Sequence, residues 1–560
     1  MTAAEAAETR IRRFIRCGRH DARMREEVRC AARGRQIRKG ETEIYSKTIS
    51  GTLSGLNAET VTVEANVTFG FPVFHIVGLA DTAIKESKER VRAAIINAGA
   101  NFPQERVIVN LSPADIRKEG THFDLPLAVS ILTAAGRNCG KIPGKGEKCA
   151  YFGELALDGS VVPVKGILPL LIDLSASGIQ TFFIPAGNLK EASIVPGIRL
   201  LPVSALRELL DHFAGTRMIR PVETGRCRKA DIAGTGGTYG TDYADVEGQE
   251  EAKRALQISA AGLHNVLLVG PPGSGKSMLI RRLPGILPPM TWEETVEVTK
   301  IYSICGMLDA ENPLMTERPF RAPDMRITPA SLVGGGMRPK PGEISLAHLG
   351  VLFLDELPEY SRQCLEALRV PMEEEAAVVV RTGGKVIFPA KFLTAAAMNP
   401  CPCGYLGDDR RECTCTQYEI ARYRARLSGP FLDRIDLFVP VRRPDRISFF
   451  EDDGSRTGMS TAQLREGVIR ARSAQERRFD REPISYNSQM TPGQLKKFCR
   501  LSEASEKLLA EAVRSLALSV RSGHRILRTA RTIADLEGKD RIEERHIAEA
   551  IRYKKEDGKR

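Results

Sequence analysis

Gly270-Pro271-Pro272-Gly273-Ser274-Gly275-Lys276-Ser277 fits the phosphate-binding pattern G-x-x-x-x-G-K-[ST]. The apolar residues 264–270 predict a buried strand before the loop, and residues 277–287 predict the start of a helix after it. In such a loop the glycines turn backbone N–H groups toward phosphates, Lys276 reaches the outer phosphates, and the Ser277 hydroxyl can hold Mg²⁺. The stretch therefore predicts a site for a nucleoside triphosphate such as ATP.

A second apolar run, residues 349–360, predicts a strand that ends in two acids. Asp355 at the strand's end is placed to hold Mg²⁺ through water, and Glu356 can orient and deprotonate an attacking water. The pair predicts hydrolysis of the nucleotide. A buried strand capped by solvated acids is the alternative.

Polar residues further along the chain complete a candidate catalytic set. Asn399 follows the next predicted strand and is placed to sense the γ-phosphate. Arg434 lies in an otherwise apolar turn, and Arg521 and Arg528 follow in a helical segment. An arginine that stabilises phosphoryl transfer often comes from a neighbouring subunit, so these residues favour a ring. A surface salt bridge is the alternative for each arginine taken alone.

The composition is that of a multidomain globular protein. The 560 residues are 42% hydrophobic, which is enough for about three to four domains. No apolar run approaches the ~18 residues that span a bilayer, so we expect no membrane partner. Eight of the 12 cysteines are scattered singly, as in a reducing compartment, and we expect a cytoplasmic protein.

The net charge of +12 is concentrated at one end of the chain. Residues 1–40 hold 12 basic and five acidic side chains, so the charge says little about the rest. We expect residues 1–44 to be a basic, disordered tail. It is either an arm that contacts nucleic acid or an extension without a function, and we favour the second interpretation.

Patterning divides the remainder into four parts. Strands predicted at 61–67 and 106–112 and helices at 81–99 and 125–134 indicate an α+β domain over residues 45–213. Residues 214–242, rich in Gly and Thr toward their end, predict a flexible linker. An α/β nucleotide-binding domain follows over 243–443, and residues 444–560 are expected to be helical, with amphipathic segments at 464–479 and 504–518.

The ordered motifs GPPGSGKS, PGEISLAHLGVLFLDELPEY, AMNPCPCG, SGPFLDRIDL and HRILRTARTIADLEG resemble the magnesium-chelatase-like AAA+ ATPases of the YifB/ComM branch, which are related to the MCM helicases. The resemblance covers residues 45–554. It implies an AAA+ P-loop domain with a helical lid, and it makes Arg434 a finger acting on a neighbouring subunit and Arg521 the second sensor. It also implies a hexameric ring and branch migration of DNA in natural transformation. Where this family has His-His, the chain has Asp324 and Met325.

Residues 376–391 predict a β-hairpin around Thr-Gly-Gly. Arg381 and Lys385 flank its turn. In proteins of the resembling clade this hairpin points into the central channel, so the two charges are candidates for gripping DNA phosphates. Solubilising charges on an exposed hairpin are the alternative.

Cys401, Cys403, Cys413 and Cys415 form two C-x-C pairs within 15 residues. Four thiolates at this spacing can close a tetrahedral Zn²⁺ site. Reduced free thiols and a redox pair are the alternatives.

Residues 117–128, 157–166 and 184–188 resemble the Lon-protease type domain of the ribosomal S5 fold. Such peptidases need a serine nucleophile and a lysine base, and the matching positions hold His122 and Leu168. We therefore expect no proteolysis, with Lys165 and Ser112 as the only nearby substitutes. The domain is expected to be a docking or regulatory module, whose partner the sequence does not name.

Three functions remain at this point. A DNA motor is favoured by the hairpin and the resemblance. A chelatase-type ATPase for metal insertion would need partner subunits and a tetrapyrrole. A non-proteolytic protein-remodelling ATPase is the third.

Overall fold

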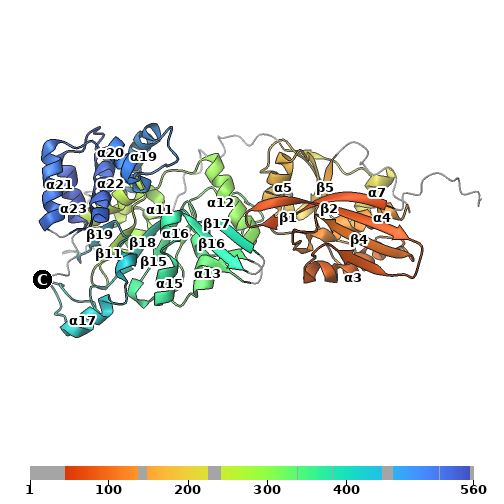
Figure 1. Cartoon of the computed structure of the whole chain (residues 1–560), viewed down its shortest axis with the longest axis horizontal. Helices are drawn as coiled ribbons and strands as arrows, with labels where there is room; N and C mark the ends of the chain where they lie inside the picture. The colour runs from red at the N-terminus through yellow and green to blue at the C-terminus, as the bar shows by residue number, and fades with distance from the viewer. Residues whose placement is uncertain are drawn as a thin grey trace, which may run out of the picture.

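The computed structural model describes residues 45–136, 148–224, 241–336, 339–381, 384–443, 458–515 and 518–554. The predicted tail, residues 1–44, lies outside these ranges. The molecule is elongated, with the N-terminal domain at one end and the nucleotide-binding domain, with the C-terminal helices packed beside it, at the other (Figure 1). No helix in the described ranges is long and apolar enough to cross a membrane.

The N-terminal domain is built on an eight-stranded sheet of order β10-β9-β8-β5-β1-β2-β4-β3. Strands β1, β2 and β4 pair antiparallel, whereas β1, β5, β8 and β9 run parallel. Its strands are β1 (Tyr45–Ser54), β2 (Asn57–Thr68), β3 (Phe74–Val77), β4 (Arg106–Ser112), β5 (Cys149–Tyr151), β8 (Thr181–Pro185), β9 (Arg199–Val203) and β10 (Val222–Glu223), and a small hairpin is formed by β6 (Glu154–Leu155) and β7 (Val161–Val162).

Helices cover both faces of this sheet. They are α3 (Thr82–Asn97), α4 (Asp124–Ala134), α5 (Ile167–Ala176), α6 (Leu189–Ala192) and α7 (Leu206–Ala214), with 3-10 turns η1 (Thr121–Phe123) and η2 (Ala186–Asn188). One core lies under α3, α4 and α7, and a second lies under α5 and α6. The strands and helices predicted for this domain are observed within two residues, apart from the longer β2. Asp81 starts α3 because its side chain accepts the N–H of Ile84.

The nucleotide-binding domain holds a five-stranded parallel sheet of order β12-β15-β18-β11-β19. The strands are β11 (Val266–Val269), β12 (Phe320–Arg321), β15 (Val351–Leu354), β18 (Leu393–Met398) and β19 (Leu437–Pro440). They are nearly all apolar because both faces are covered. The carboxyl ends of β15, β18 and β11 are neighbours, so the residues that follow them meet at one edge.

Short helices and two hairpins surround this sheet. The helices are α9 (Glu250–Gly262), α10 (Lys276–Arg281), α11 (Leu283–Ile286), α12 (Trp292–Cys305), α13 (Pro329–Val333), α14 (Glu343–Leu346), α15 (Arg362–Ala367), α16 (Pro371–Glu374), α17 (Gln417–Arg424) and α18 (Gly429–Leu432), with turns η3 (Tyr243–Asp245) and η4 (Leu357–Glu359). The hairpins are β13 (Gly334–Gly335) with β14 (Lys340–Pro341), and β16 (Ala376–Arg381) with β17 (Gly384–Pro389).

The C-terminal part is helical, as predicted. It contains α19 (Thr461–Arg478), η5 (Asn487–Gln489), α20 (Pro492–Phe498), α21 (Glu503–Ser515), α22 (Val520–Leu536) and α23 (Glu544–Arg552). Buried side chains of α19, α22 and α23 share one core with α9 and one face of the parallel sheet. The helical lid is therefore packed onto the nucleotide-binding domain (Figure 1).

Part of the segment predicted as a flexible linker forms secondary structure with the N-terminal domain. Strand β10 lies inside the predicted range 214–242 and pairs antiparallel with β9. The Thr224 hydroxyl is buried, donates to the Ile198 carbonyl at 3.0 Å and accepts the Ile198 N–H. Edge pairing of this kind needs backbone groups rather than an apolar pattern, so sequence periodicity does not reveal it. Residues 225–240 lie outside the described part of the chain.

The first two domains share an interface between α5 and α12. Trp292 and Val296 pack against the N-terminal core beneath α5. The partly buried Glu191 carboxylate accepts the Ser303 hydroxyl at 2.5 Å, and the Gly166 N–H donates to the Ser303 carbonyl at 3.1 Å. The helix α12 is thus joined to the N-terminal domain by both apolar and polar contacts.

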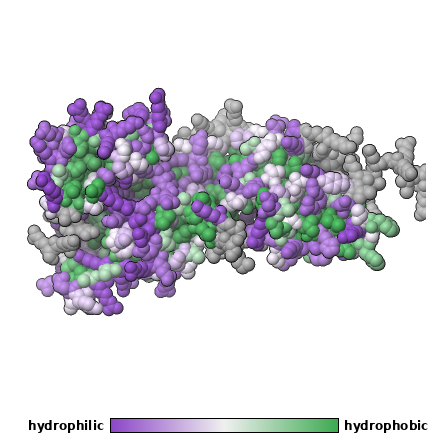
Figure 2. Space-filling model, in the orientation of Figure 1, coloured by the Kyte–Doolittle hydropathy of each residue, from purple (hydrophilic) through white to green (hydrophobic). Residues whose placement is uncertain are grey.

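Exposed apolar side chains gather at the far end of the N-terminal domain. Phe69 and Phe71, in the loop between β2 and β3, are among the most exposed large apolar residues in the described ranges. Figure 2 shows pale green surface at this end, while purple polar surface dominates the C-terminal helices.

Candidate nucleotide site and cysteine cluster

The phosphate loop joins β11 to α10 as the sequence predicts. A side chain on Gly270 is excluded because its Cβ would fall 2.0 Å from the Val441 carbonyl oxygen. Gly273 and Gly275 have φ of +76° and +87°, a backbone conformation that favours glycine. The loop therefore needs glycine at these three positions for steric reasons.

Lys276 lies inside this loop. Its Nζ donates to the carbonyl oxygens of Gly270 at 2.7 Å and Pro271 at 2.9 Å, and to Asn399 Oδ1 at 3.3 Å. Burial lowers the pKa of Lys276, and the charges of Asp355 and Glu356 oppose that shift. The structure thus brings Lys276 together with Asn399, the residue predicted to sense the γ-phosphate.

The Ser277 hydroxyl donates to Asp355 Oδ2 at 2.8 Å. Glu356 follows on the exposed side, in a left-handed backbone conformation with φ of +50°. A hydroxyl beside a carboxylate, with a second carboxylate next in the chain, is an oxygen donor set that fits Mg²⁺. Four residues predicted for nucleotide chemistry, Lys276, Ser277, Asp355 and Asn399, therefore share one edge of the sheet.

The two other predicted catalytic residues meet elsewhere. Arg434 donates to the Arg369 carbonyl at 2.9 Å and pairs with Glu373 at 2.8 Å, and Arg521 pairs with the same Glu373. Arg434 also donates to the Pro430 carbonyl at 2.5 Å. Among the described residues, none of the hydrogen bonds and ion pairs found for the two arginine side chains reaches the phosphate loop. Sequence reasoning missed Glu373, although an acidic run precedes the hairpin.

The predicted hairpin is formed by β16 and β17, with Arg381 opposite Gly384 and Val380 opposite Lys385. Lys385 and Val380 are exposed. Thr382, Gly383 and the side chain of Arg381 lie outside the described part of the structure.

Asp324 and Met325 lie in the loop after β12. The Tyr360 hydroxyl donates to the Pro323 carbonyl at 2.6 Å, and Asp324 Oδ1 accepts the Arg326 N–H at 2.8 Å. Burial, together with the charges of Asp355 and Asp324, raises the pKa of Tyr360. The loop is thus held close to the strand end that carries Asp355.

The four predicted cysteine ligands converge. Their sulfurs all lie within 4.8 Å of one another, and Cys401 is buried while the other three are partly exposed. The pKa of the Cys403 thiol is lowered to about 5. The largest cause is a hydrogen bond from the backbone N–H of Tyr405. The set offers four soft ligand atoms at one point.

The two residues expected at the Lon-type positions, His122 and Leu168, are both buried. His122 is buried, and its Nε2 lies 2.8 Å from the Gly51 carbonyl. Burial lowers the pKa of His122 to about 4, so the ring is neutral at pH 7. Leu168 is fully buried in the core, and Lys165 lies against Gly306 of the nucleotide-binding domain.

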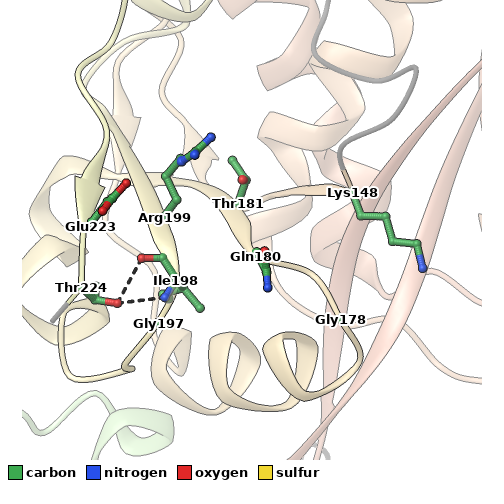
Figure 3. Close-up of a pocket in the computed structure, with 9 residues that line it drawn as sticks. All are labelled: Lys148, Gly178, Gln180, Thr181, Gly197, Ile198, Arg199, Glu223 and Thr224. Atoms are coloured by element: carbon green, nitrogen blue, oxygen red, sulfur yellow. Dashed lines mark hydrogen bonds between the residues drawn. The ribbon is translucent and has the colours of Figure 1, made fainter. Parts of the chain in front are cut away.

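A pocket of about 560 Å³ lies at the edge of the N-terminal sheet (Figure 3). It contains none of the residues predicted for chemistry, and its open, polar lining does not resemble a closed ligand site. Its lining residues are Lys148, Gly178, Gln180, Thr181, Gly197, Ile198, Arg199, Glu223 and Thr224.

A P-loop, an acidic strand end and an asparagine sensor on a parallel sheet, followed by a helical lid, define an AAA+ nucleotide-binding protein. Family models for the magnesium chelatase subunit ChlI match residues 63–188 and 242–448, and its C-terminal model matches residues 458–554. The chain belongs to this family of magnesium-chelatase-like AAA+ ATPases.

Similar curated proteins span nearly the whole chain. It is 40% identical to competence protein ComM of Haemophilus influenzae over 502 residues, 89% of this chain and 95% of that protein. It is 38% identical to the uncharacterised protein YifB of Escherichia coli over 504 residues, with the same coverage. A peroxisomal Lon protease homologue of Oryza sativa subsp. indica is 28% identical over 185 residues, 30% of this chain and 20% of that protein. These matches confirm the expected family and the Lon-like α+β domain before the AAA+ domain.

Proposed function

We propose that this chain is an ATP-hydrolysing ring motor that acts on DNA, with branch-migration or helicase-type activity in recombination or natural transformation. ATP hydrolysis is supported by one observation: contacts join Lys276 to Asn399 and Ser277 to Asp355 at one edge of the sheet. The DNA part is supported by the basic turn of the hairpin and by the name of the Haemophilus relative, a competence protein.

Each residue has a defined task in this proposal. The loop's backbone N–H groups and Lys276 bind the phosphates, and Asn399, fixed by the lysine, aligns the attacking water. Glu356 accepts the water's proton. Ser277 and Asp355 would hold Mg²⁺, which would supply neutralisation of the phosphate charge.

Arg434 acts as a finger on the neighbouring subunit's nucleotide, and Arg521 is the second sensor. Their joint placement at Glu373, with no polar contact to their own phosphate loop among the described residues, supports delivery across an interface. A closed ring supplies that interface at every site, and we propose six subunits in the cytoplasm.

The test is the ATPase rate with single-stranded, forked and Holliday-junction DNA. We expect stimulation by at least one of them, and its loss in Arg381→Ala/Lys385→Ala with basal hydrolysis retained. The matched control is Lys507→Ala/Arg514→Ala, which removes two positive charges from the surface of α21. Equal stimulation of both double variants would refute the role of the hairpin.

Failure of all three DNA forms to stimulate would instead favour a protein-remodelling role. A chelatase role would require partner subunits and a tetrapyrrole.

A further inference from the structure

We propose that the four cysteines hold one Zn²⁺ and that this ion positions the loop forming one wall of the nucleotide site. Zinc binding by the four cysteines does not depend on the proposed function, whereas the effect of the zinc ion on ATP turnover rests on it.

The spacing of the sulfurs fits a metal rather than a bond between them. Cys401 Sγ lies 3.4 Å from Cys403 Sγ and 3.6 Å from Cys413 Sγ, and Cys403 Sγ lies 3.6 Å from Cys413 Sγ. A disulfide brings two sulfurs to about 2.05 Å. A tetrahedral zinc with Zn–S of about 2.3 Å spaces its ligands by about 3.8 Å, close to the observed separations.

The loop is arranged to stabilise bound thiolates. The Cys403 N–H donates to Cys415 Sγ at 3.3 Å, so backbone as well as metal holds the two pairs together. Hydrogen bonds from the backbone to ligand sulfurs are the usual surroundings of a structural zinc. The Thr416 side chain then caps α17, which ends the loop in a rigid element.

This loop touches the phosphate loop. Gly404 packs so closely on Pro272 that a Cβ would fall 2.6 Å from the proline Cδ. Arg443 donates to the Pro272 carbonyl at 3.2 Å, pairs with Asp408 at 3.5 Å and lies over the Tyr405 ring at 5.6 Å. Contacts from both Gly404 and Arg443 therefore press the cysteine loop against Pro272.

The same loop begins at the predicted sensor. Cys401 lies two residues after Asn399, whose side chain contacts Lys276. A metal that fixes Cys401 limits the movement of Asn399, because two residues of backbone leave little freedom. Zinc thus acts on the water-aligning asparagine and on the phosphate loop at once.

The experiment measures zinc and ATP turnover on the full chain purified under reducing conditions. We expect about one zinc per chain by elemental analysis. Cys413→Ser/Cys415→Ser should lose it, whereas Cys305→Ser, a partly buried cysteine outside the cluster, should keep it. Wild-type protein without stoichiometric zinc overturns the proposal.

A second pair of variants separates the metal from its effect. Gly404→Ala should keep zinc but lower kcat at least tenfold, because its methyl group displaces Pro272. Gly407→Ala is the matched control: it has a similar positive φ in the same loop, but its Cβ would meet nothing within 4 Å. Equal kcat and KM for these two variants would overturn the positioning role, even if the cysteine double variant fails to fold.

If wild-type chain hydrolyses no ATP, the proposed function fails, and the zinc content still decides the metal site. Binding of a fluorescent ATP analogue then replaces kcat as the readout. Weaker binding by Gly404→Ala than by Gly407→Ala supports the contact, and equal binding refutes it.

Discussion

The N-terminal domain and the nucleotide-binding domain are both sheets covered by helices, but they differ in what occupies the positions expected to do chemistry. In the nucleotide-binding domain, Lys276 and Asn399 are in contact at the sheet edge. In the N-terminal domain, His122 and Leu168, the residues expected at the Lon-type positions, are both buried. The two domains thus share a general architecture, but only in the nucleotide-binding domain do side chains expected to do chemistry contact one another.

The buried polar groups of the two domains are satisfied in different ways. The polar groups of the nucleotide site contact one another, so a ligand can exchange places with these contacts. His122 instead lies against the Gly51 carbonyl and the rings of Phe123 and Phe152, so its side chain is held within the packing of its own domain.

The strongest test of the comparison is Arg434→Ala. We expect ATP turnover to fall about 10³- to 10⁵-fold, because an arginine finger neutralises charge in the transition state. Arg514→Ala, an exposed arginine on α21, should leave turnover unchanged. Mixing inactive Arg434→Ala and Lys276→Ala chains should restore part of the activity in steady-state assays. No recovery on mixing would contradict action across subunits.

Glu356→Gln should lower kcat about 10²- to 10⁴-fold through loss of the base, with nucleotide binding retained. Measurements of turnover and of fluorescent-nucleotide affinity separate the two effects. Glu359→Gln is the control, since Glu359 lies three residues on and pairs with Arg426 at 2.6 Å. Equal turnover of the two variants would remove Glu356 from the mechanism.

In the N-terminal domain, the buried His122 should make the free energy of unfolding depend on pH. Its pKa is about 4 in the folded state and 6.5 as the ordinary value, so the unfolded chain binds more protons between these values. Stability present above pH 6.5 is therefore lost as pH falls toward 4, by about 3 kcal/mol. His122→Gln does not titrate and should remove this loss in urea unfolding.

Asp124, in the same domain, changes stability with pH in the opposite direction to His122. Burial raises its pKa to about 6, although Arg90 opposes the shift. Its contribution to stability is thus full below pH 3.8 and falls as pH rises through 6. The difference between wild type and His122→Gln isolates the histidine, and identical pH profiles would show that His122 is not buried as a neutral ring.

The smallest expected effect concerns the contact between the two domains. Ser303→Ala removes a hydroxyl donor from the partly buried Glu191, which keeps the Asn188 amide and the Leu168 N–H as partners. We expect a loss of about 1 kcal/mol in unfolding free energy. Ser175→Ala, whose hydroxyl bonds within α5, should change little. An equal loss of unfolding free energy in both variants would show that the Ser303–Glu191 contact does not help to join the domains.

Much of the fold was predictable because its signals are local. Strand β4 was predicted at residues 106–112 and lies there, and α3 starts beside its Asp81 cap. The hairpin followed from Thr-Gly-Gly between two apolar runs. Strand β10 was missed because it is two exposed residues long and pairs through its backbone alone.

The candidate nucleotide site was predictable as a list of residues but not as a set of contacts. Residues that follow the carboxyl ends of parallel strands lie at one edge of the sheet, and Arg443, three residues after β19, is such a residue. Its contact with Pro272, however, depends on how the cysteine loop folds back. Glu373 joins Arg434 and Arg521 from more than 60 positions away, and no spacing in the sequence predicts that meeting.

The amino-acid sequence alone determined the phosphate loop, the acidic strand end and the family, because short-range steric and chemical demands impose those residue types. Only the tertiary structure decided which distant groups meet: two arginines at Glu373, four sulfurs at one point and Pro272 under the cysteine loop. The physical reason is that these contacts arise from the packing of whole elements, whose geometry is set by the core rather than by the residues in contact.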